Sequence, residues 1–216
     1  MFEMHTIKAK LTFLEEILGT ASNNPEIHSE FIASKAPTVE SADEEVAAIN
    51  VEEEIEKAMT VFPRNENGDP ILFDYQVKGF FKDACGVLRR VPGSKASKIK
   101  AYKKEIDGLL FISPRMIPLN MPSTMSECQR PLRAATAQGE RIALAHSEAA
   151  PAGTTIEIEI QCMTKDMYDL ARECLEYGKL RGIGQWRNSG KGRLVWEELD
   201  DNGNVIGGNY DPAAIK

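Results

Sequence analysis

The sequence is poor in the residues that most enzymes use for metal binding and proton transfer. Its 216 residues include four cysteines and three histidines. No two cysteines form a Cys-x-x-Cys pair, which excludes a zinc ribbon and suits a reducing compartment. The sequence also lacks four motifs of catalytic or nucleotide-binding sites: a Walker loop, a dinucleotide-binding turn after a strand, a nucleophile elbow and a His-x-x-x-His pair. We therefore expect no metal ion and no cofactor. The four cysteines are Cys85, Cys128, Cys162 and Cys174, and we expect most of their thiols to be buried.

Long apolar runs are missing too. No stretch approaches the roughly 20 apolar residues that a membrane-spanning helix needs. The segment Met1–His5 is acidic and leads into an alternating pattern, unlike a signal peptide. These features predict a cytoplasmic protein with no membrane partner.

Acidic residues outnumber basic ones, but their distribution is uneven. The formal net charge is −7. Residues 1–60 hold 4 basic and 13 acidic side chains, residues 61–135 hold 13 and 7, and residues 136–216 hold 9 and 13. The overall charge disfavours unspecific binding to a polyanion, whereas the middle of the chain is basic. The composition is therefore compatible with a local basic face.

The hydrophobic pattern predicts two main helices and several strands. Apolar and polar residues alternate from Ile7 to Phe13, as in a half-buried strand. Apolar residues recur at helical spacing from Val77 to Leu88 and from Met167 to Leu175, after the capping residues Asp74 and Thr164. This βαββαβ order is typical of a ferredoxin-like α+β fold. The expected series is strand 5–14, helix 75–90, strand 106–117, strands or hairpins 130–162, helix 164–177 and strand 193–199.

The other segments separate or extend these elements. Residues 20–60 are expected to form an acidic helical insertion, and Asn67-Gly68 predicts a hairpin over residues 61–73. Residues 91–105 are expected to form a loop whose lysines surround one tyrosine, a composition suited to a nucleic-acid backbone. Residues 201–216 are expected to form a turn and a loose tail.

A glycine-rich stretch, Gly182–Arg193, lies between the second helix and the last strand. Two Gly-x-Gly pairs flank a five-residue tip. Glycine permits positive φ and close backbone approach, and consecutive N–H groups in such a turn can surround an anion. Trp186 offers a stacking face for a base, while Arg187, Lys191 and the final arginine can meet phosphates. The alternative is an ordinary turn between a helix and a strand.

The spacing of these glycines resembles the glycine-rich loop of the RAMP superfamily, the RRM-like RNA-binding proteins associated with CRISPR systems. In that family the loop joins the last helix to the last strand of a ferredoxin-like βαββαβ unit. The resemblance covers the first strand and residues 70–200, and it implies one domain over residues 1–200 whose loop and first helix face RNA. The residues that it assigns to RNA binding are Lys78, Lys82, Gly182, Gly184, Gln185, Trp186, Arg187, Asn188, Ser189, Gly190, Lys191, Gly192 and Arg193.

Three hypotheses about function follow. The first is a non-catalytic subunit that binds single-stranded RNA within a larger assembly, CRISPR-type or phage-borne, with protein partners or further copies of itself. The second is an interaction or decoy protein of the same shape, whose acidic segment contacts a protein partner. The third is a metal-independent ribonuclease that uses a histidine as general acid or base, as some members of the resembling family do. His28 is its best candidate because it falls between the first strand and the first helix; the other histidines are His5 and His146.

Overall fold

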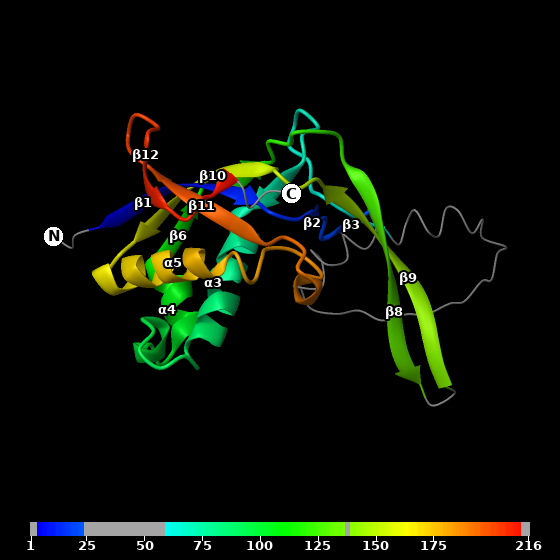
Figure 1. The fold of residues 1–216 in the computed structure, drawn as a ribbon, viewed down its shortest axis with the longest axis horizontal. Coiled ribbons are helices and arrows are strands. Elements are labelled where there is room, and N and C mark those ends of the chain that lie inside the picture. Colours follow the sequence, from blue (N-terminus) through cyan, green and yellow to red (C-terminus); the bar gives the residue numbers. More distant parts are fainter. Residues whose placement is uncertain (1–3, 24–58, 137–138, 213–216) are drawn as a thin grey trace, which may run out of the picture.

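The structure, a computed structural model, describes residues 4–23, 59–136 and 139–212. Most of the expected acidic insertion lies outside these residues, as does His28. Figure 1 shows two parts, a sheet with helices on one face and a long ribbon of two strands that extends away from it.

The body of the protein is a five-stranded antiparallel sheet with the first strand at its centre. β1 (His5–Phe13) pairs with β10 (Thr155–Cys162) on one side and with β11 (Leu194–Leu199) on the other. β6 (Leu110–Ser113) and β12 (Val205–Gly208) form the edges, so the order is β12-β11-β1-β10-β6. Without β12, this is the antiparallel strand order of a ferredoxin-like βαββαβ unit. The predicted α+β fold class is confirmed.

Two helices cover one face of this sheet (Figure 1). α3 (Asp74–Leu88) precedes β6, and α5 (Lys165–Tyr177) connects β10 to β11. Their buried residues recur every three or four positions, which gives each helix one apolar face. These residues are Val77, Phe80, Phe81, Ala84 and Cys85 in α3, and Met167, Leu170, Ala171, Cys174 and Leu175 in α5.

The two helices begin with different caps. Thr164 behaves as predicted: its hydroxyl oxygen accepts a hydrogen bond from the N–H of Met167 at 3.2 Å. In α3 the expected cap, Asp74, is instead the first residue of the helix. Gln76 Oε1 accepts a hydrogen bond from the backbone N–H of Phe73 at 2.7 Å. The glutamine at the third helical position therefore provides the acceptor for the N–H of the residue before the helix.

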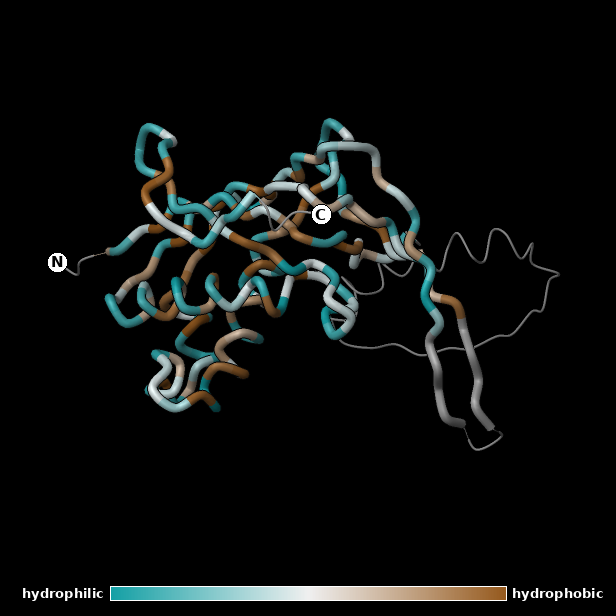
Figure 2. Tube along the Cα trace, in the orientation of Figure 1, coloured by the Kyte–Doolittle hydropathy of each residue, from teal (hydrophilic) through white to brown (hydrophobic). Residues whose placement is uncertain are grey.

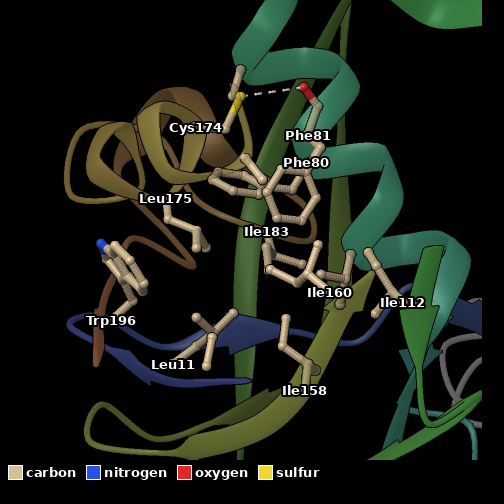
Figure 3. Close-up of a cluster of buried hydrophobic side chains, with 14 of the residues drawn as sticks. Leu11, Phe80, Phe81, Ile112, Ile158, Ile160, Cys174, Leu175, Ile183 and Trp196 are labelled. Carbon is tan, nitrogen blue, oxygen red and sulfur yellow. Dashed lines mark hydrogen bonds between the residues drawn. The ribbon is translucent and has the colours of Figure 1, made fainter. Parts of the chain in front are cut away.

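The hydrophobic core lies between the sheet and these helices (Figure 3). Leu11, Ile158 and Ile160 point from the strands towards Phe80 of α3. Trp196 of β11 belongs to the same cluster and is 1% exposed. Figure 2 shows hydrophobic and hydrophilic residues alternating along the central strands. This alternation is what allows the sheet to be buried on one side only.

Three of the four thiols are buried in this core, and the fourth is not. Cys85, Cys162 and Cys174 have no exposed area, whereas Cys128 is partly exposed. Burial raises the pKa of Cys85 to about 11 and that of Cys162 to about 12, so these thiols hardly ionise near neutral pH. We expect an alkylating reagent at about pH 8 to label the native protein at Cys128 alone and the denatured protein at all four thiols. Mass mapping of labelled peptides checks this, and native labelling at Cys162 would contradict it.

The second part of the molecule is a long ribbon. β8 (Ser126–Thr136) pairs with β9 (Gly139–Ala150) in one antiparallel register, so a hairpin does form within the segment 130–162, where strands or hairpins were expected, and its first arm begins earlier, at Ser126. At the body, β9 also pairs with β2 (Ile17–Leu18), which follows β1 closely in the chain. β9 also pairs in parallel with β4 (Thr60–Val61) at one position, where Thr60 lies beside Ser147, and β4 pairs with β3 (Ala21–Ser22).

The hairpin predicted over residues 61–73 is wrong in its pairing. A turn does form at Asn67-Gly68, where Arg64 and Pro70 form a bridge and backbone hydrogen bonds join Asn65 to Asp69 and Ile71 to Pro63, but the predicted arms at residues 61–62 and 71–73 do not pair with each other. The second arm, β5 (Ile71–Phe73), pairs with β7 (Met116–Pro118) instead. The first two residues of β5 are fully buried by that arrangement, which a free hairpin could not achieve.

Two further predictions need correction. Residues 91–105 do not form a simple loop, because they contain the short 3₁₀ turn η1 (Ala96–Lys98) and the start of α4 (Tyr102–Leu109). Ile106 of α4 is fully buried, so packing extends the helix beyond the predicted start of the strand. The turn expected after the last main strand does form, at residues 201–203, but the residues that follow it are not loose up to residue 208, because β12 pairs with β11.

Candidate nucleic-acid interface

The glycine-rich loop joins α5 to β11 and leaves no room for a side chain at two of its glycines. A Cβ on Gly182 would overlap with the backbone of Gly192, and a Cβ on Gly192 would overlap with the carbonyl oxygen of Ile183. The N–H of Ile183 donates to the Gly192 carbonyl at 3.0 Å, and the N–H of Gly192 donates to the carbonyl of Glu16 at 2.8 Å. The two arms of the loop therefore touch each other beside the segment that follows β1.

Four residues of the loop have a left-handed backbone. The φ angles are +90° at Gly184, +88° at Gly190, +70° at Gly192 and 53° at Trp186. Glycine adopts this conformation without steric cost, whereas other L-residues lose about 1–2 kcal/mol. The short helical turn η2 (Arg187–Ser189) begins directly after the strained tryptophan. Strain of this kind persists only where the surroundings impose it, and it is frequent at functional sites.

The strained backbone presents the ring of Trp186 at the surface. The residue is 39% exposed, and the guanidinium of Arg130, from β8, lies 5.6 Å from the ring centroid. Gln185 points inward, where its Nε2 donates to the carbonyl of Gly19 at 2.8 Å and its Oε1 accepts from Arg130. Arg130 is 9% exposed, and its Nε has no hydrogen-bond partner. A buried cation thus supports the ring, and more than a third of the residue stays open to a stacking partner.

The predicted phosphate-binding side chains of the loop all face carboxylates of neighbouring segments. The pairs are Arg187 with Asp83 at 3.1 Å, Lys191 with Glu16 at 2.5 Å and Arg193 with Glu15 at 2.6 Å. Asp83 also accepts from Arg181, so this carboxylate faces two guanidinium groups and leaves one positive charge in excess. A phosphate that reaches the loop therefore shares these cations with carboxylates.

Two further polar residues of the tip hold its shape. The side-chain oxygen of Asn188 accepts from Arg181 at 3.1 Å, and the hydroxyl of Ser189 donates to the carbonyl of Trp186 at 3.2 Å. The N–H of Ser189 donates to the same carbonyl at 3.0 Å. Both side chains therefore stabilise the turn after the tryptophan, whatever the turn binds.

The two predicted lysines of α3 form a separate cluster with α4 and β6. Lys78 Nζ donates to the carbonyl of Asp107 at 2.9 Å and lies 5.0 Å from the centroid of Phe111. Burial lowers the pKa of Lys78. Lys82 forms an ion pair with the Asp107 carboxylate at 2.5 Å. The structure thus brings the loop residues together, whereas the polar and ring contacts of these two lysines are with Asp107 and Phe111 and not with the loop.

The partners of the loop are the residues that sequence reasoning missed. Glu15 and Glu16 follow β1, and they come beside the end of the loop because Phe13 of β1 pairs with Leu194 of β11. Two consecutive glutamates at the end of the central strand were the available signal, but it becomes meaningful only when β1 and β11 are known to be neighbours. Arg130 lies far from the loop in sequence, and no pattern connects the two.

The two described histidines lie in different sheets, each with a local partner. His146 pairs with Glu127 across the ribbon, and this hydrogen bond lowers the pKa of Glu127. The ring of His5 packs against Tyr168 with 5.8 Å between centroids.

Among the described residues, no three His, Cys, Asp or Glu side chains gather as a metal-binding group. None of the described helices is long and apolar enough to span a membrane.

Comparisons with known proteins point to the fold. No protein-family model and no curated protein sequence matches this chain. A solved structure does match, a chain in the cryo-EM structure of the Type III-B Cmr-beta bound to cognate target RNA, with a TM-score of 0.50 and 11% sequence identity. The match covers 92% of this chain and 60% of that one, so this chain spans less than two thirds of its neighbour. At this identity the likeness concerns the fold, and it agrees with the ferredoxin-like strand order.

Proposed function

We propose that this chain is a non-catalytic, RAMP-like subunit that binds RNA within a larger CRISPR-type or phage-borne ribonucleoprotein. The observation that carries the proposal is the glycine-rich loop, which joins the second main helix to the fourth strand of a ferredoxin-like unit and exposes Trp186 from a left-handed backbone. The fold likeness to a chain from an RNA-bound structure supports it. Single-stranded RNA is the expected ligand, because unpaired bases can stack on an aromatic ring.

The open face of the sheet is a poorer platform for RNA than the loop. Lys8 lies opposite Glu159, and Lys10 lies opposite Glu157 on one neighbour and Glu197 on the other. Cross-strand pairs of opposite charge neutralise each other, and the glutamates repel phosphate. We therefore assign RNA contact to the loop and the adjoining side of α3.

The ribbon offers a surface for protein partners or for another copy of the chain. β8 pairs only with β9, and residues 139–146 of β9 pair only with β8, within the part of the chain that the structure describes. Both edges of this ribbon therefore carry backbone N–H and C=O groups that can receive a strand from another chain. This feature supports a subunit that works within an assembly.

Replacing Trp186 tests the proposed function. We expect Trp186→Ala to weaken binding of single-stranded RNA by about 10-fold or more, because stacking of a base on an aromatic ring contributes about 1–3 kcal/mol. Alanine carries the same left-handed backbone cost as tryptophan, so the melting temperature should change little. Fluorescence anisotropy with a labelled RNA of mixed sequence measures the affinity.

The matched control is Tyr210→Ala, which removes an exposed aromatic ring after β12, outside the loop. It should bind RNA as the wild type does. Equal affinities of Trp186→Ala and wild type would reject the loop tip as the RNA site.

A further inference from the structure

An apolar pocket of about 610 Å³ opens between the glycine-rich loop and the N-terminal half of α3. Its lining includes Leu72, Phe80 and Ile183, which belong to the buried core. Tyr75 also lines it, is 59% exposed, and has its ring stacked on that of Phe73 with 5.3 Å between centroids. An apolar pocket with an exposed aromatic ring suits a flat heterocycle such as a nucleobase.

The apolar pocket also contains groups that can bind the edge of a base. Gln76 Nε2 donates to the hydroxyl of Thr20 at 2.5 Å, while Gln76 Oε1 accepts from the N–H of Phe73. These bonds use one of the two amide hydrogens of Gln76 and one of the lone pairs on its oxygen. The same side chain can therefore offer both a donor and an acceptor to a base.

A basic hollow of about 410 Å³ lies on the other side of α3, against the start of α4. Lys82, Arg90 and Lys103 line it. Lys82 pairs with Asp107, whereas Arg90 and Lys103 form no ion pair with any carboxylate in the described part of the chain. Residues 75–104, which supply this lining, carry nine basic side chains and one acidic side chain. The charge of the basic hollow suits a phosphodiester group.

The apolar pocket and the basic hollow meet at Gly79 and Asp83, which line both. These two residues lie four positions apart and follow one another along one stripe of α3. Gly79 is exposed, and a Cβ added there would meet no described atom within 4 Å. Glycine destabilises an exposed helix relative to alanine, and no packing contact of the described fold requires it here. Close approach of a ligand's backbone would account for a glycine at this position.

We propose that an RNA strand crosses α3 over Gly79, with one base in the apolar pocket and an adjoining phosphate in the basic hollow. The proposal rests on the proposed function and extends the RNA path from the loop to α4. Arg187 connects the glycine-rich loop to the apolar pocket, because it belongs to the loop and also lines the pocket. Asp83 does not oppose the strand, since Arg181 and Arg187 both pair with its carboxylate.

A single substitution tests the crossing point. Gly79→Gln favours the helix and places a side chain on the stripe between the apolar pocket and the basic hollow. We expect about a 10-fold loss of affinity for labelled single-stranded RNA of mixed sequence, with an unchanged or higher melting temperature. Gly108→Gln in α4 is the matched control, because a Cβ there also meets no described atom within 4 Å and Gly108 lines neither cavity.

Two further variants separate the base from the phosphate. In Arg90→Gln/Lys103→Gln, the slope of log affinity against log salt should become shallower by about 0.7, the value for one phosphate contact on a single strand. Lys179→Gln removes an exposed charge outside the basic hollow and is the control. Binding of inorganic polyphosphate should weaken in the double variant and stay unchanged in Tyr75→Ala, which should lose affinity for RNA only.

The outcomes distinguish this proposal from the proposed function. If Trp186→Ala loses RNA affinity while Gly79→Gln binds as tightly as Gly108→Gln, the loop function stands and the crossing path is overturned. If the wild type binds no single-stranded RNA, both fail. If adenosine monophosphate binds as tightly as RNA and Tyr75→Ala abolishes that binding, the two cavities belong to a free nucleotide and the crossing path is again overturned.

Discussion

Gly182→Ala is expected to lower the free energy of unfolding by about 3 kcal/mol and to abolish the native shape of the glycine-rich loop. The new Cβ would overlap with the backbone of Gly192, so the two arms of the loop must separate. Separation breaks the hydrogen bond from the Ile183 N–H to Gly192 and displaces the one from the Gly192 N–H to Glu16. Urea denaturation followed by far-UV circular dichroism measures the loss.

Gly108→Ala is the matched control for Gly182→Ala, because it adds the same methyl group to an open position on a helix. It should raise the free energy of unfolding by about 0.5–1 kcal/mol. The RNA affinity of Gly182→Ala should fall at least as far as that of Trp186→Ala, since the whole tip loses its position. Wild-type stability in Gly182→Ala would show that the arms do not touch in solution.

Trp196→Ala is expected to reduce the free energy of unfolding by about 3–5 kcal/mol. Trp196 is among the largest fully buried side chains, so its removal leaves a cavity that the neighbouring side chains cannot fill completely. Its Nε1 donates to Glu176 at 2.9 Å, and the guanidinium of Arg172 lies 5.1 Å from a centroid of its ring system. Both contacts disappear with the ring.

Circular dichroism is the suitable probe, because the chain has only two tryptophans and this variant removes one of them. Trp196→Phe keeps an aromatic ring in the core and should cost clearly less than Trp196→Ala. Below its melting temperature, Trp196→Ala should still bind RNA, since the residue lies in the core beneath α5 and not in the loop. A loss below about 1 kcal/mol would contradict the burial of this ring.

The order of the main elements could be predicted because each carries its own periodic signal. β1 and β10 alternate strictly enough for their inward faces to be read from the sequence, and α3 and α5 keep the helical period over three or more turns. The strands β2, β3 and β4 could not be predicted, because each has two residues and exists only through its partners. The pairing of β5 was predicted wrongly because its true partner, β7, is distant in sequence.

The candidate site could be predicted in shape but not in charge. The spacing of glycines indicated a loop with left-handed positions, and the φ angles at Gly184, Gly190 and Gly192 agree. The three carboxylates that pair with the loop come from two separate segments, two from the turn after β1 and one from α3, so composition alone could not reveal them. The sequence correctly indicated a basic middle segment, but among the described residues Arg90 and Lys103, which have no carboxylate partner, lie beside or in α4, whereas Arg187, Lys191 and Arg193 of the loop are paired.

The attachment of the ribbon has a mechanical consequence. Gly19 donates its N–H to Glu148 in β9 and accepts from Gln185 of the loop, and Arg130 in β8 donates to the same glutamine. The amide side chain of Gln185 therefore connects the base of the ribbon to the loop tip that carries Trp186. Because coupling between two sites is reciprocal, we expect a change that moves the loop tip to move the base of the ribbon as well, and the reverse.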